Sequence, residues 1–123
     1  MGYESKFYIV EKGHYDDSRQ MHYGHVIAMF DMSKCYPLSS VFQGFKKTDC
    51  FFYADDGNTE IVEDMYGEPL KEATIERTLR LVQTVMEEED YRRLLSFEAL
   101  LRALQAQQKD GKWGDLAVLH YGY

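Results

Sequence analysis

The hydrophobic pattern of the chain changes its period near Ala73, and this change constrains the fold more than any other feature. Before it, short aromatic and β-branched runs alternate with polar, glycine-containing stretches, which is typical of strands. After it, Ile75, Leu79, Val82 and Met86 recur at spacings of four, three and four, so they lie on one face of a helix. A chain of 123 residues with this pattern predicts a single α+β domain over its whole length.

Four strands are expected ahead of the helices. The runs at residues 3–11 and 25–32 predict the first two strands, separated by a polar loop over residues 13–24. Residues 50–54 and 59–66 predict a hairpin. Its turn consists of residues that tolerate tight geometry or positive φ, namely Asp55, Asp56, Gly57 and Asn58.

A second helix and a final strand follow the first helix. Residues 113–123 predict a fifth strand with two apolar faces, as in strands that lie inside a sheet. Ser96 could begin a kink within the second helix. The apolar stripe of that helix consists of Leu94, Phe97, Leu101 and Leu104.

These elements predict an α+β fold with an antiparallel or mixed five-stranded sheet. The order is β-β-β-β-α-α-β, with both helices on one face and the C-terminal strand central. The strand at residues 25–32 is apolar on both faces, yet two helices cover one face only. Either the connection at residues 36–47 or a second copy of the chain must cover the other face, and the sequence predicts a homodimer.

Charge and composition exclude several classes of partner. A net charge of -7 and a pI near 5.0 disfavour direct binding to nucleic acid or to an anionic membrane surface. The N-terminus lacks the pattern of a signal peptide, and no apolar run is long enough to cross a bilayer. Cys35 and Cys50 form no Cys-x-x-Cys pair, which favours two free thiols in a reducing compartment. We therefore expect a soluble cytoplasmic protein.

Residues 49–70 carry seven acidic side chains and no lysine or arginine. Apolar residues alternate with them, so the charge is carried by a folded hairpin and can be presented rigidly to a basic partner. Charges on an edge strand also prevent pairing with other chains, which is the simpler explanation. The predicted partner-binding residues are Asp55, Asp56, Glu60, Glu63 and Asp64.

The sequence holds no nucleotide-binding, serine-nucleophile or kinase motif. Candidate metal ligands or acid/base groups are His22, His25 and His120, but residues three apart on a strand face opposite ways. The spacing of a zincin site is missing as well, and the sequence predicts no cofactor.

The favoured function is a small acidic protein-binding module, either an inhibitor or an adaptor. Its expected partner is a basic protein surface, such as the groove of a nucleic-acid-binding protein, where carboxylates can replace phosphates. One alternative is a small metal-assisted hydrolase or ligand-binding enzyme that uses the three histidines. The other is a structural homo-oligomer.

Overall fold

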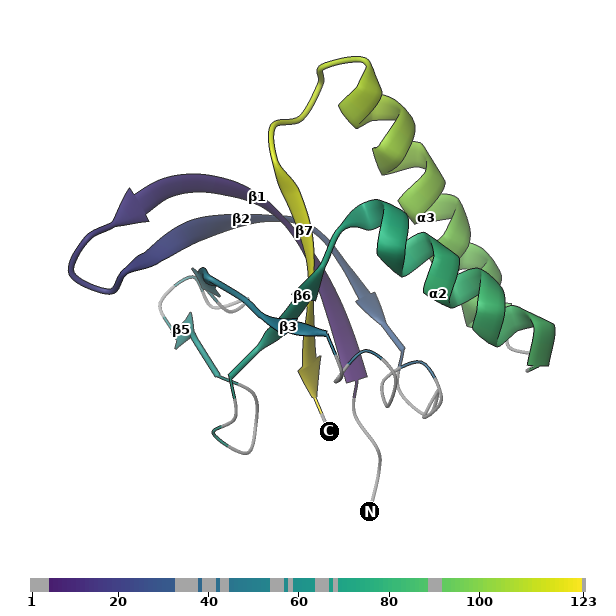
Figure 1. The fold of residues 1–123 in the computed structure, drawn as a ribbon, viewed down its shortest axis with the longest axis horizontal. Helices are drawn as coiled ribbons and strands as arrows, with labels where there is room; N and C mark the ends of the chain where they lie inside the picture. Colours follow the sequence, from purple (N-terminus) through teal and green to yellow (C-terminus); the bar gives the residue numbers. More distant parts are fainter. Residues whose placement is uncertain are drawn as a thin grey trace.

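The structure, a computed structural model, describes residues 5–32, 38, 42, 45–53, 57, 59–63, 67, 69–88 and 92–122 (Figure 1). All structural statements below concern these residues. In chain order the elements are β1 (Ser5–Asp16), β2 (Met21–Asp31), β3 (Lys46–Lys47), β4 (Cys50–Tyr53), β5 (Glu60–Ile61), β6 (Lys71–Ala73), α2 (Ile75–Glu88), α3 (Arg92–Lys109) and β7 (Leu116–Gly122).

The strands form one mixed sheet in the order β3-β6-β7-β1-β2-β4-β5. Every neighbouring pair is antiparallel except β2 and β4, which run parallel. The predicted α+β class is confirmed, but the predicted strand number is wrong, because the described residues form seven strands. The two unexpected strands, β3 and β6, hold two and three residues, too few for a periodic pattern to appear in the sequence.

The C-terminal strand β7 lies between β6 and β1, as predicted. Its side chains are buried on both faces of the sheet. Leu116 and Val118 pack toward the helices, whereas Ala117 and Leu119 pack on the opposite face. A charged side chain would be buried on either face of a strand in this position, which explains the apolar sequence of β7.

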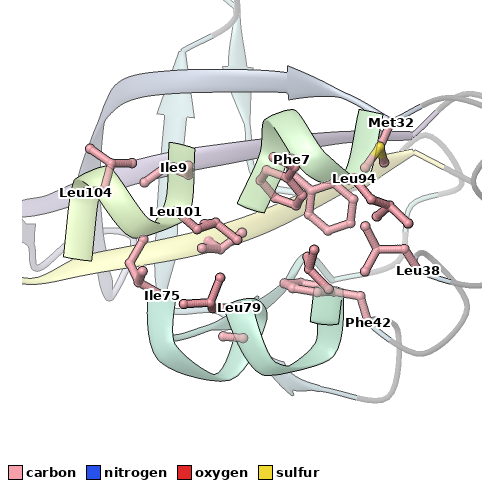
Figure 2. Packing of buried hydrophobic residues seen from close by; sticks show 14 of the residues in the cluster. Phe7, Ile9, Met32, Leu38, Phe42, Ile75, Leu79, Leu94, Leu101 and Leu104 are labelled. Atoms are coloured by element: carbon pink, nitrogen blue, oxygen red, sulfur yellow. The ribbon is translucent and has the colours of Figure 1, made fainter. Parts of the chain in front are cut away.

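Both helices cover the same face of the sheet, which confirms that prediction (Figures 1 and 2). Phe7 and Ile9 of β1 face the helices, and Phe97 of α3 packs against the ring of Phe7 with centroids 5.2 Å apart. In α2, Val85 is buried more deeply than the predicted Met86. The predicted stripe of α3 is fully confirmed, since its buried residues are Leu94, Phe97, Leu101 and Leu104.

The ends of the helices have recognisable caps. The backbone N–H of Arg77 donates to Oγ1 of Thr74 at 3.1 Å, so Thr74 is the N-cap of α2. At the end of α3, Gly111 has a φ of +77°, and the N–H of Lys112 donates to the carbonyl of Gln107 at 2.9 Å. This bond closes the helix in a Schellman motif. The helix α3 runs without interruption through Ser96, so the predicted kink is absent.

The sheet curls until its two ends meet. Strands β3 and β4 are nearly consecutive in the chain, yet β3 pairs with β6 and β4 pairs with β2. Between them, the N–H of Thr48 donates to the carbonyl of Leu70 at 2.9 Å, and the carbonyl of Asp49 accepts from His22 at 2.7 Å. The curl encloses a second cluster of buried residues, made of Tyr8, Val10, Cys50, Phe52, Leu70, Ala117 and Leu119.

This inner cluster covers part of the sheet face that lies opposite the helices. The chain itself covers that face along β7 and the first part of β1, by folding β4 and Leu70 over it. Within the expected cover at residues 36–47, Leu38 and Phe42 pack on the helix side instead. An uncovered face therefore no longer supports the predicted homodimer, which stays a prediction and needs a different argument.

The first hairpin is longer than the sequence suggested. The predicted loop over residues 13–24 is wrong, because β1 continues to Asp16 and β2 begins at Met21. The turn occupies residues 17–20, with Gln20 at a φ of 56°. Its far end projects from the body of the sheet (Figure 1), where polar residues on both faces suit a strand pair that is partly solvated.

The second hairpin pairs β4 with β5 through Phe52 opposite Ile61 and Tyr53 opposite Glu60. This pairing confirms the predicted hairpin, although β5 is shorter than residues 59–66. Glu63 forms an isolated antiparallel bridge with Pro69, so the chain after β5 returns toward β6. The turn residues Asp55, Asp56 and Asn58 lie outside the described residues.

Candidate functional site

The described residues form one concentrated group of charged side chains, where the sheet closes on itself. Lys12 lies two residues after Val10 in β1 and so shares its face, the inner face of the curled sheet. Its Nζ lies 3.0 Å from Oδ1 of Asp49, in the link between β3 and β4, and 3.2 Å from Oε2 of Glu72, in β6. The group therefore joins three segments that are distant in the sequence.

Glu72 is the buried member of this group, with a side chain only 6% exposed. Its Oε1 accepts a hydrogen bond of 2.8 Å from Oγ1 of Thr48 and one of 3.3 Å from the N–H of Asp49. Lys46 Nζ approaches its Oε2 at 4.0 Å from the solvent side. A carboxylate with this many donors around it is held in one position.

The charges in the group shift one another's pKa values. Burial alone would lower the pKa of Lys12, but the hydrogen bond to Asp49 and the charge of Glu72 outweigh it and raise that pKa. Burial alone would raise the pKa of Asp49, but the contact with Lys12 outweighs it and lowers that pKa. Burial raises the pKa of the neighbouring Cys50 thiol to about 12, although the charge of Lys12 opposes this shift.

Asp49, Cys50 and Glu72 place possible metal ligands within 4.8 Å of one another. Two observations argue against a metal there. The ammonium group of Lys12 already contacts both carboxylates, so a positive charge is present without an ion. The pKa of the buried Cys50 thiol is raised to about 12, so a metal ion would have to displace a tightly held proton before it could bind the sulfur. The group is best understood as an ion cluster that fixes the closure of the sheet.

The three candidate histidines are spread along β1 instead of converging. In the sheet register, His22 lies opposite Tyr15, His25 opposite Glu11 and His120 opposite Phe7. His120 is buried, and its Nε2 lies 2.8 Å from Oγ of Ser5. The group of possible ligands found among the described residues includes no histidine. This arrangement gives no support to a histidine-based metal site or active site.

The predicted acidic hairpin has an anchor that the sequence did not reveal. Arg19, in the turn between β1 and β2, forms an ion pair with Glu60 of β5, and its Nε lies 3.2 Å from Oε2 of that residue. The guanidinium group also pairs with Asp16 and lies 5.0 Å from the ring centre of Phe51 in β4. Arg19 thus holds the second hairpin against the tip of the first.

The five predicted partner-binding residues have different outcomes. Glu60 is half-buried and paired with Arg19, so its charge is largely neutralised. Glu63 is exposed. The remaining three, Asp55, Asp56 and Asp64, lie outside the part of the chain that the structure describes. The cluster residues Lys12, Thr48 and Glu72 were missed because they are distant in the sequence, and because Thr48 and Glu72 lie beside or within strands too short to show a period.

No family model, no curated protein and no solved structure matches this chain. The described helices include none with the length and apolar character needed to cross a membrane.

Proposed function

We propose that this protein is a small acidic protein-binding module, an inhibitor or adaptor, that docks its second hairpin against a basic protein surface. The observation that carries the proposal is the excess of acidic residues in the sequence at positions 49–70, a segment that includes the β4–β5 hairpin, which Arg19 anchors to the rest of the fold. A basic groove that normally accepts phosphates is a suitable partner surface.

The anchoring supports this proposal because it reduces the entropy lost on binding. The hydroxyl of Tyr53 donates to Oε1 of Glu60 at 3.4 Å, and Tyr53 packs against Tyr23 with ring centres 5.6 Å apart. Strand β4 is thus tied to β2 as well as to Arg19. A hairpin fixed before binding presents its carboxylates at a lower conformational cost than a flexible tail does.

The remaining negative charge is available beside the anchor. Glu63 is exposed, and the side chain of Asp49 is 53% exposed although one of its oxygens contacts Lys12. The sequence adds Asp55 and Asp56 between these positions and Asp64 directly after Glu63. A chemical role for the charged cluster is less well supported, since its carboxylates are already paired with Lys12 and with donors from the link between β3 and β4.

A charge-neutralised variant tests the proposal. Asp56→Asn, Glu63→Gln and Asp64→Asn together remove three charges and leave Glu60, the partner of Arg19, unchanged. The matched control neutralises three exposed acidic residues elsewhere, Glu87, Asp110 and Asp115. A pull-down with the wild-type chain first identifies the partner, and association rates are then measured at low and physiological salt.

We expect the hairpin variant to fold normally and to associate more slowly, with a weaker dependence on salt, whereas the control behaves like the wild type. Equal rates for the two variants would contradict the proposal. The acidic residues would then serve only solubility and protection of the strand edge.

A further inference from the structure

The outer edge of β2 has no strand partner over most of its length, within the described part of the chain. One side of β2 pairs with β1 from end to end. On the other side, β4 pairs only with His22 and Tyr23. Beyond Tyr23, no other strand of the described residues pairs with this side of β2.

This open edge is unlike the other edges of the sheet. Residues 26–30 carry no charge, and Val26 and Met29 are 40% and 41% exposed. By contrast, β3 carries Lys46 and Lys47 at its edge, and β5 carries Glu60. Charged residues on an edge strand prevent pairing with other chains, and residues 26–30 of β2 carry none.

The direction of the backbone groups follows from two hydrogen bonds. The N–H of Met32 donates to the carbonyl of Ser5 in β1. Backbone N–H and C=O groups point to alternate sides along a strand, so those of Phe30 point toward β1 and those of Met29 point away from it. The N–H of Lys12 donates to the carbonyl of Asp115, which places the backbone of Lys12 toward β7.

Val10 lies two residues before Lys12 in β1, so its backbone N–H and C=O groups also point toward β7. Val26, which lies opposite Val10, turns its own backbone outward. Within the described residues, Val26 and Met29 thus point their N–H and C=O groups away from β1 at an edge of β2 that no strand pairs with.

A β-bulge separates these two positions. Ile9 lies opposite Ala28 and Val10 opposite Val26, so Ile27 is an extra residue in β2. The outward groups are consequently three residues apart instead of two. The outward groups of a regular strand are two residues apart, so such a strand cannot pair with both positions. A second copy of β2 that runs antiparallel has the same three-residue spacing and can pair with both.

We propose that the chain forms a symmetric homodimer by antiparallel pairing of β2 with β2 of a second copy. In the register that matches the outward groups, Val26 of each copy lies opposite Met29 of the other. Both side chains lie on the inner face, since their β1 neighbours Val10 and Tyr8 belong to the inner cluster. The pairing would thus cover the two large hydrophobic residues that β2 exposes.

The ends of the open edge limit the length of this pairing. At one end β4 already occupies the edge as far as Tyr23. At the other end, the guanidinium group of Arg93 donates to the carbonyl of Asp31 at 3.3 Å. The ladder between them is short, so the dimer depends on concentration. This inference is independent of the proposed binding role of the second hairpin.

Sedimentation tests the association. We expect the mass to approach twice the 14.4 kDa of one chain as the concentration rises. Val26→Lys and Met29→Lys should each shift this transition to higher concentration by tenfold or more, because a charge then faces an apolar residue of the second copy. The matched control is Leu95→Lys on α3, where the wild-type residue is 57% exposed.

Amide hydrogen exchange tests the register in the wild-type chain, without any mutation. At low concentration the amides of Val26 and Met29 should exchange quickly, and at high concentration they should become protected. Ala28 and Phe30, which turn toward β1, should be protected at both concentrations. A chain that stays monomeric, or a dimer in which Val26 and Met29 exchange as quickly as in the monomer, would overturn the proposal.

Discussion

Lys12 and Glu72 are in contact although β7 lies between their strands: Nζ is 3.2 Å from Oε2. The contact exists because β3, β6 and β1 converge where the curled sheet closes. Thr48 and Asp49, which link the two ends of the sheet, both donate hydrogen bonds to the same carboxylate. The ion pair is thus part of the closure of the sheet.

Replacement of Lys12 by Met should destabilise the fold strongly. Glu72 would lose its close counter-ion and keep only the exposed Lys46 at 4.0 Å, and a buried charge whose partner is removed costs about 3–5 kcal/mol. The double variant Lys12→Met with Glu72→Gln should lose less, since the glutamine oxygen can still accept from Thr48. Urea unfolding measures both variants. Equal losses would show that the charge of Glu72 is not what makes the single variant unstable.

Cys50 should resist alkylation in the folded protein. Its thiol is buried and has a pKa raised to about 12, so almost no thiolate is present at pH 8. In a Cys35→Ser background, the rate of reaction with iodoacetamide should keep rising with pH until the pH nears 12. Rapid modification at pH 8 without unfolding would contradict this prediction.

The same thiol makes stability depend on alkaline pH. A cysteine in the unfolded chain releases its proton near pH 9.0, whereas folded Cys50 keeps its proton until about pH 12. Its contribution to stability is therefore complete below pH 9.0 and is lost as the pH rises toward 12. Replacement of Cys50 by Ala should make the free energy of unfolding decline less steeply over this interval.

Gly24 should be intolerant of a side chain. A Cβ at this position would lie 3.1 Å from Cβ of Val10 and 3.2 Å from the carbonyl oxygen of Phe51, where β4 approaches β2. Gly24→Ala should therefore cost about 1–3 kcal/mol. Gly13→Ala is the control, since its Cβ would meet the nearest atom at an ordinary 3.5 Å. Thermal unfolding should separate the two variants, and equal melting temperatures would contradict the argument.

The sequence predicted the parts of the fold that have a local periodic signal. The stripe from Leu94 to Leu104 was correct because a helical face repeats over several turns. The apolar faces of β7 were correct because burial on both sides excludes charge. The expectation of a loop over residues 13–24 failed because a projecting hairpin keeps polar residues on both faces.

The charged cluster could not be predicted in the same way. Lys12 and Glu72 are 60 residues apart, and they meet only because the sheet curls. The strands that produce this meeting, β3 and β6, are too short to show a period. The anchor of the acidic hairpin was hidden for a related reason. Nothing beside Arg19 in the sequence indicates that its partner is Glu60.

The ion pair of Arg19 with Glu60 should control the order of the second hairpin. Arg19→Met removes the contacts with Glu60 and Asp16 and the cation over Phe51. Because these contacts are partly exposed, we expect little change in global stability but faster amide exchange in β4 and β5. The control Arg80→Met breaks the exposed pair with Glu76 on α2 and should leave the hairpin unchanged. If the amides of β4 and β5 are equally protected from exchange in both variants, Arg19 does not hold the hairpin. The rigidity of the hairpin must then come from the packing of Phe52 against Tyr8.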